Sequence, residues 1–179
     1  MLFKPTSLLL ASATCLLASP LTQEHIVPNS YVELYRQPAI HSNGSLVYLG
    51  HASGTEPASS GVQERASCQN NPAPTCSGKH TARNDICDSL VTELFADPQI
   101  GVAQSPRQIC YQGAAAESND YCCVSWHNVV PNLTKGDLAA IANTMLQTCT
   151  SNGISGKTYN IWVRQTCTSV CLSNRGTGC

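Results

Sequence analysis

Apolar side chains recur at helical spacing in two stretches of the chain. In residues 81–97 they fall three or four positions apart, and Pro98 stops the pattern. The second stretch opens on Thr134 and Asp137, which have the spacing of a capping box, and it ends at Gly153. Its apolar positions are Leu138, Ile141, Ala142, Met145, Leu146 and Cys149. The pattern predicts two helices, each with one buried side.

Alternation of apolar and polar residues predicts three strands. Two of them, at 107–111 and 121–126, are short. The third runs from 158 to 166 and alternates most clearly. Its two faces are expected to be Tyr159, Ile161 and Val163 on one side and Asn160, Trp162 and Arg164 on the other.

The order of these elements predicts the fold class. If the residues around Cys68 add a strand, the order is β-α-β-β-α-β, as in a split βαβ unit. We therefore expect an α+β, disulfide-rich two-layer sandwich, in which an antiparallel sheet carries both helices on one face.

The chain before Cys68 has a different character. Residues 1–20 have one positive charge at Lys4 and then a short apolar run, the layout of a secretory signal peptide rather than of a membrane span. Residues 21–67 contain no cysteine and are rich in small and polar residues, which predicts a low-complexity arm. Two short strand-like pieces flank an Asn-Gly turn at Asn43, so a loose hairpin is expected there. The cysteine-rich domain is expected over residues 68–179.

Ten of the eleven cysteines lie in the last 112 residues, an even number that permits five disulfides. They are Cys68, Cys76, Cys87, Cys110, Cys122, Cys123, Cys149, Cys167, Cys171 and Cys179. Cys122 and Cys123 are adjacent in a strand and should point to opposite faces, with Cys87 and Cys149 as inward candidates, but the pairing stays open. Disulfides persist outside the cytosol, so the protein is expected to be secreted and extracellular.

Composition and motifs exclude several classes of function. There is no Cys-x-x-Cys pair and no cluster of histidines, so no metal site is expected. No phosphate-binding loop appears, and no cofactor is expected. Charged residues are 12% of the chain and the net charge is −1, which gives no argument for nucleic acid as a partner. Acidic residues are absent after Asp137, where only Lys157, Arg164 and Arg175 carry charge.

Two pairs of residues are candidates for chemistry or contact. His80 and His127 are the histidines of the cysteine-rich part and are the only basis for a small secreted hydrolase. No Asp or Glu is placed by sequence to orient them, so no residue is assigned as catalytic. Trp162 and Arg164 share a predicted strand face, and if that face is open they form an aromatic and cationic surface for a partner. The alternative is that another segment covers it.

Two sequons are present in the chain. Asn43 and Asn132 each stand two positions before a Ser or Thr, so both are expected to carry N-linked glycans if the chain is secreted. Thr134 then has two candidate roles, in the sequon and as a helix cap.

Several strings resemble a family of secreted fungal proteins, the WD-like cysteine-rich proteins, over residues 68–179. They are Cys110-Tyr111, Cys122-Cys123-Val124-Ser125-Trp126, Gly136-Asp137-Leu138 and Cys167 through Cys171-Leu172-Ser173-Asn174-Arg175. The family is associated with no established activity, so the resemblance implies no catalytic residue. In pattern alone, Trp126, Asp137, Cys149 and Cys167 also occupy places similar to those in the Ecp2 effector and KP4 killer-toxin group.

The sequence and these resemblances together suggest a function. We expect a secreted, disulfide-stabilised monomer that acts by binding, as an effector or a killer-toxin-like protein, and contributes to virulence or microbial antagonism. Its partner would be a protein or glycan on a host or competitor cell surface. The alternatives are the hydrolase already described and a structural protein of the cell wall or surface.

Overall fold

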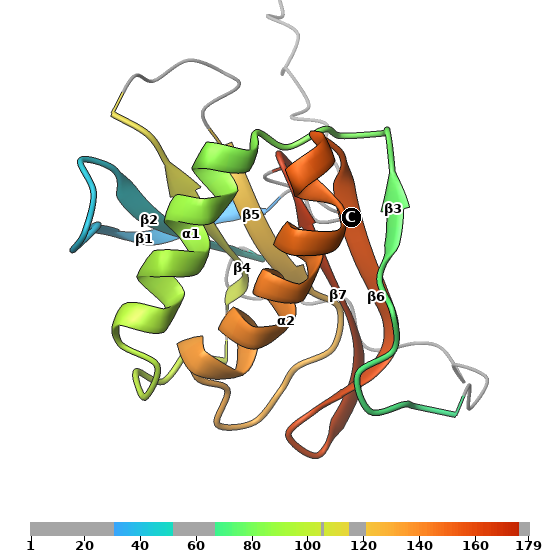
Figure 1. Ribbon diagram of the computed structural model, residues 1–179. Helices are drawn as coiled ribbons and strands as arrows, with labels where there is room; N and C mark the ends of the chain where they lie inside the picture. Colours follow the sequence, from blue (N-terminus) through green and yellow to red (C-terminus); the bar gives the residue numbers. More distant parts are fainter. Residues whose placement is uncertain (1–30, 52–66, 105, 115–120, 176–179) are drawn as a thin grey trace, which may run out of the picture.

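A seven-stranded sheet and two helices make up the described part of the chain, which is residues 31–51, 67–104, 106–114 and 121–175 of a computed structural model (Figure 1). The strands are β1 (Val32–Pro38), β2 (Ser45–Gly50), β3 (Thr75–Ser77), β4 (Pro106–Gln112), β5 (Tyr121–Trp126), β6 (Ser155–Val163) and β7 (Thr166–Ser173). The helices are α1 (Asn84–Ala96), α2 (Lys135–Thr148) and the short 3-10 helix η1 (Thr150–Asn152). The expected signal peptide lies outside the described residues.

The sheet is antiparallel throughout, and its strand order is β1-β2-β4-β5-β7-β6-β3. Both helices pack on the same face of the sheet and against one another, as Figure 1 shows. The prediction of a disulfide-rich α+β sandwich with two helices on one face is therefore confirmed.

The main core lies between the helices and the sheet. The helices contribute fully buried residues such as Leu90, Leu94, Leu138 and Met145, and the strands contribute Ile109, Val124 and Leu172. On the second face of the sheet, which is the face away from α1 and α2, a smaller buried cluster consists of Val47, Leu49, Cys110 and Cys123. The sheet is thus apolar on both faces near its middle.

Helix α2 begins with the capping box that the sequence predicted. The Thr134 hydroxyl accepts a hydrogen bond from the Asp137 N–H at 3.4 Å, and the Asp137 carboxylate accepts one from the Thr134 N–H at 2.8 Å. Together they satisfy two backbone donors that the first turn of a helix leaves without partners. Gly136 packs so closely against Pro98 that an added Cβ would lie 2.8 Å from the Pro98 carbonyl oxygen. The start of α2 is therefore fixed both by its cap and by the loop that follows α1.

The β1–β2 hairpin is part of the main sheet. Six residue pairs join β2 to β4, so the sheet continues across residue 67, where the cysteine-rich domain was expected to begin. Leu46 and Tyr48 of β2 are buried in the main core. The turn of the hairpin is also held to α1, because the Glu93 carboxylate accepts hydrogen bonds from the backbone N–H groups of Ile40 and His41.

Strand β7 corrects an expectation from the sequence. No strand was expected after residue 166, yet the residues of β7 form an eight-residue strand between β5 and β6. Val170 and Leu172 point into the main core, whereas Cys171, between them, lies on the second face. The polar residues of β7 hid this alternation, because Thr168 and Ser173 are buried although they are not apolar.

A β-bulge in β6 corrects a second expectation. Thr158 pairs with Val170 and Ile161 with Thr168, so β6 has one more residue than β7 in this interval. Asn160, the residue with a φ of 50°, absorbs the difference in a left-handed conformation that asparagine tolerates. Tyr159 therefore lies on the second face, opposite to Ile161 and Val163, and is exposed.

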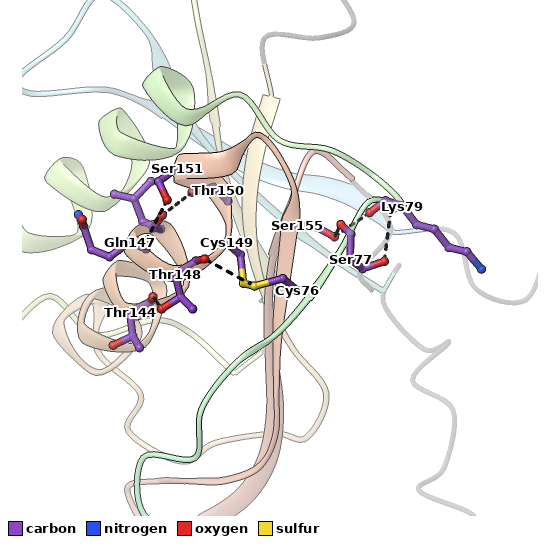
Figure 2. Close-up of a disulfide and its surroundings, with 11 residues drawn as sticks. Cys76, Ser77, Lys79, Thr144, Gln147, Thr148, Cys149, Thr150, Ser151 and Ser155 are labelled. Carbon is purple, nitrogen blue, oxygen red and sulfur yellow. Dashed lines mark hydrogen bonds between the residues drawn. A yellow bond between two sulfur atoms is a disulfide. The ribbon is translucent and has the colours of Figure 1, made fainter.

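Four disulfides join the described residues, and they are Cys68–Cys167, Cys76–Cys149, Cys87–Cys122 and Cys110–Cys123. Cys87–Cys122 fastens α1 to β5 within the core. Cys110–Cys123 joins neighbouring strands on the second face. Cys76–Cys149 ties the exposed edge strand β3 to the end of α2, as Figure 2 shows. Cys171 is also disulfide-bonded.

Candidate functional site

Two large aromatic side chains are exposed on the second face of β6. Tyr159 is 51% exposed and Trp162 is 45% exposed, and the bulge between them places both on the same side of the strand. Lys157 is on this side as well, with its ammonium 4.7 Å from the centre of the Tyr159 ring, a distance typical of a cation–π contact. We call Lys157, Tyr159 and Trp162 the β6 aromatic face.

The backbone beneath these side chains is held from both sides. Gln69 donates its N–H to the Asn160 carbonyl oxygen at 2.8 Å and accepts from the Trp162 N–H at 3.2 Å. On the other side, Trp162 pairs with Cys167 of β7, which is bonded to Cys68, next to Gln69. The hydrogen bonds and the disulfide thus connect the backbone segments on both sides of Trp162 to one another. The backbone position of Trp162 is therefore fixed before any partner arrives, which lowers the entropic cost of binding.

Exposure sets these two rings apart from most other large aromatic residues of the sheet. Tyr48, Tyr111 and Trp126 are at most 5% exposed. Trp126 lies in the main core, and Tyr48 stacks on Tyr35 with ring centres 4.1 Å apart. An exposed tryptophan beside a tyrosine is a common contact surface, since large rigid rings bury much area and lose few rotamers.

The two chain segments that form the β6 end of the sheet carry charge of one sign. Residues 67–84 and 138–175, which contain β3, β6 and β7, include no Asp or Glu. Lysine and arginine are present in both segments, so this end of the sheet is mildly basic. A partner that carries negative charge meets no repulsion from these segments.

Arg164 has a different neighbour from the one expected. Its Nε donates to the Asp137 carboxylate at 2.6 Å, which ties the β6–β7 turn to the start of α2. Burial raises the pKa of Asp137, but hydrogen bonds from Arg164 and Thr134 outweigh it and hold that pKa below its ordinary value. The cation next to an aromatic ring of β6 is thus Lys157. Direct contact of Trp162 and Arg164 with a partner remains a prediction.

The two histidines do not share a site. The His80 carbonyl oxygen accepts from the Asn174 N–H, whereas the His127 N–H donates to the Ser169 carbonyl oxygen. Ser169 and Asn174 are five residues apart along β7, which corresponds to about 16 Å. Both histidines are exposed, but the separation is too great for one acid–base pair acting on one bond.

The two sequon asparagines are both exposed. Asn43 lies at the tip of the β1–β2 hairpin, and Asn132 lies in the turn before α2 with a φ of 55°. Thr134 caps α2, as described above, so both of its candidate roles are compatible with its position. Asn43 is at the opposite edge of the sheet from β6, so a glycan there would leave the β6 aromatic face uncovered.

An open depression lies on the helix side of the described surface. It is lined by His41, Asp88, Val91, Thr92, Phe95, Ala96 and Asn143. Phe95 is 48% exposed there. The walls of the depression come from α1, α2 and the hairpin turn.

In the described part of the chain, no group of three or more His, Cys, Asp or Glu residues is arranged to hold a metal ion. No helix there has the length and apolar character needed to cross a membrane.

The fold and its cross-links define the class of protein, a small disulfide-rich α+β protein of the extracellular kind. Residues 41–179 match the family described as fungal WD-like, so the chain belongs to the fungal WD-like family. The match begins in the turn of the β1–β2 hairpin and so includes β2 as well as the cysteine-rich residues. No curated protein and no solved structure matches the chain, and the resemblance to the Ecp2 and KP4 group receives no support.

Proposed function

We propose that this fungal WD-like protein is secreted and acts by binding, and that the β6 aromatic face is its contact surface. The observation that carries the proposal is the pair of exposed rings, Tyr159 and Trp162, on one side of a backbone held by Gln69 and a disulfide. A backbone held in this way supports recognition by the rings that it carries, because binding does not have to order that backbone.

The first experiment measures binding of the labelled, oxidised protein to intact host or competitor cells and to their isolated walls. We expect Tyr159→Ala or Trp162→Ala to weaken binding about tenfold, the effect of removing a central aromatic contact. Phe95→Ala is the matched control, because Phe95 is as exposed as Trp162 but lies on α1. The proposal fails if Phe95→Ala abolishes binding and the β6 variants do not.

The biological role that we propose for this binding is that of an effector or killer-toxin-like protein, in virulence or in antagonism towards other microbes. A cross-linked, low-charge protein survives outside the cell, which supports such a role. A gene-deletion strain should lose virulence or competitive fitness and regain it with the wild-type gene but not with Trp162→Ala. Unchanged infection and competition in the deletion strain would refute it.

We also propose that Asn43 and Asn132 carry N-linked glycans, since both are exposed and stand in sequons. Treatment of the secreted protein with a glycosidase should reduce its mass in two steps. Asn43→Gln and Asn132→Gln should each remove one step, and a secreted wild-type protein of unmodified mass would contradict the proposal.

A further inference from the structure

We propose that the β6 aromatic face binds an acidic polysaccharide, one whose sugar units carry carboxylate groups. This inference rests on the proposed function, because it names the partner of the same surface. It follows from the shape of the aromatic face, from the charge around it and from what surrounds it on the sheet.

The aromatic face is a narrow row along one strand. Tyr159 and Trp162 are three residues apart in β6, but the bulge between them shortens this interval to about two residues of the neighbouring strand, or about 7 Å. Each ring offers a flat apolar surface of the kind on which the C–H face of a sugar stacks. A row of this length extends beyond a single sugar unit, so it suits a polymer lying along β6 better than a monosaccharide.

Lys157 provides the charge at one end of the row. It lies two residues before Tyr159, and its ammonium sits 4.7 Å from the centre of that ring, so a sugar stacked beside the ring would be close to a positive charge. Lys79 is exposed beside the first residue of β6, since the Ser155 hydroxyl donates to the Lys79 carbonyl oxygen at 2.7 Å (Figure 2). A carboxylate on the sugar would form a charge-assisted hydrogen bond with an ammonium here.

The absence of acids in the surrounding segments favours a charged polymer over a neutral one. No Asp or Glu occurs in residues 67–84 or 138–175, so an anionic chain along β6 is attracted at Lys157 and repelled by none of these residues. A neutral polymer would stack equally well but would gain nothing from the lysine, which it would have to desolvate in part.

The limited width of the exposed apolar row favours a polysaccharide over an acidic protein. On the same face of the sheet, Val47 and Leu49 are buried and cannot extend the contact. A stable protein–protein interface needs about 800 Å² from each partner, far more than two rings and a lysine provide. A chain one sugar wide fits the row without requiring a broader surface.

The test compares two polymers with the same backbone, polygalacturonate and its fully methyl-esterified form, in titrations at low and high salt. We expect binding to polygalacturonate about tenfold tighter than to the ester at low salt, and a smaller difference at high salt because salt screens the ammonium. Trp162→Ala should weaken binding to both polymers about tenfold. Lys157→Ala should weaken only polygalacturonate, by about threefold, and Lys157→Arg should restore it.

Two controls separate this inference from general charge attraction. Arg36→Ala removes one positive charge at the β1 edge, and it should leave polygalacturonate binding unchanged. Dextran sulfate, which is more highly charged, should not compete at equal concentration of charge. The inference is overturned if dextran sulfate competes with polygalacturonate and Trp162→Ala has no effect on polygalacturonate binding.

The remaining outcomes distinguish this inference from the proposed function. Equal binding of both polymers would overturn the acidic specificity. Two results would show that the inference is wrong: neither polymer binds, or the cell-surface partner is an acidic protein. If Trp162→Ala still abolishes binding to cells in either case, the proposed function stands. If Trp162→Ala has no effect on cells either, both are wrong.

Discussion

At the scale of single residues, the most consequential polar group is a buried carboxylate. Glu93 is 1% exposed, yet it lies on a helix that otherwise turns apolar residues inward. It accepts hydrogen bonds at 2.8 Å and 2.7 Å from Ile40 and His41, and one from the Ser42 hydroxyl. The hairpin turn thus has its backbone donors satisfied by a residue more than fifty positions away, which no local sequence pattern indicates.

Replacing Glu93 should destabilise the protein. Glu93→Gln keeps the shape of the side chain but presents an N–H group to a turn that has only donors, so we expect a loss of about 2–4 kcal/mol in the free energy of unfolding. Denaturant titration with the disulfides intact measures this loss. Ser42→Ala, which removes only the hydroxyl donor, is the control and should cost less than half as much. Equal effects of the two variants would contradict the account.

A second prediction at this scale concerns pH. The pKa of Asp137 is held below its ordinary value of about 4, so the ionised carboxylate is bound more strongly in the folded chain. Its contribution to stability is therefore present above about pH 4 and is lost as the pH falls through the lowered pKa. The stability difference between wild type and Asp137→Asn, measured by denaturant titration, should shrink as the pH falls from 5 to 2. A difference that stays constant over this range would show that the ion pair with Arg164 is not its source.

At the scale of elements, the edge strand and the disulfides divide the molecule into more and less accessible parts. Strand β3 has three residues, all exposed, and is held to α2 by Cys76–Cys149. Cys68 and Cys167 are half-buried, whereas Cys87, Cys122, Cys110 and Cys123 are fully buried. Among these four disulfides, a reductant therefore meets two accessible bonds and two that the fold protects.

We expect this difference to set the order in which the disulfides open. Under native conditions and limiting dithiol, Cys76–Cys149 and Cys68–Cys167 should be reduced before Cys87–Cys122 and Cys110–Cys123, because attack requires access to a sulfur atom. Alkylation followed by peptide mapping identifies the thiols in the order of their appearance. In denaturant the order should vanish. Early alkylation of Cys87 in the folded protein would show that access does not control the reaction.

At the scale of the whole molecule, one continuous sheet joins segments that differ in composition. The low-charge hairpin pairs with β4 of the cysteine-rich part and fills the core with Leu46 and Tyr48. Without it, the apolar strand β4 would become an edge, and unpaired apolar edges promote aggregation. The hairpin, although no described disulfide reaches it, is needed for the integrity of the sheet.

Truncation tests this conclusion and the expected domain boundary together. A protein that begins at residue 67 should be less stable than one that begins at residue 31 and should aggregate more readily. Thermal unfolding and size-exclusion chromatography compare the two, and Leu46→Ala in the longer protein, expected to cost about 2–5 kcal/mol, reports on packing alone. A stable, monomeric protein from residue 67 onward would show that the cysteine-rich part folds independently.

Much of the fold could be predicted from the sequence because its signals are local. The apolar spacing in α1 and α2, the capping box at Thr134 and the short strands at β4 and β5 depend on residues close in the chain. Strand β7 escaped prediction because its polar residues are buried by long-range pairing. The candidate site could be predicted only in part. Trp162 was indicated by alternation, but Tyr159 was placed on the wrong face, since a single-residue bulge reverses the alternation.

The sequence by itself determined the class of fold, the presence of the two helices and the presence of a cross-linked scaffold, because helical spacing, caps and cysteine count are properties of the chain. Only the tertiary structure decided which cysteines pair, where the hairpin docks and which aromatic rings reach the surface. Those features depend on contacts between residues far apart in sequence, such as Gln69 with β6 and Glu93 with the hairpin turn. No local pattern encodes these contacts, and the surface that we propose for binding is a consequence of them.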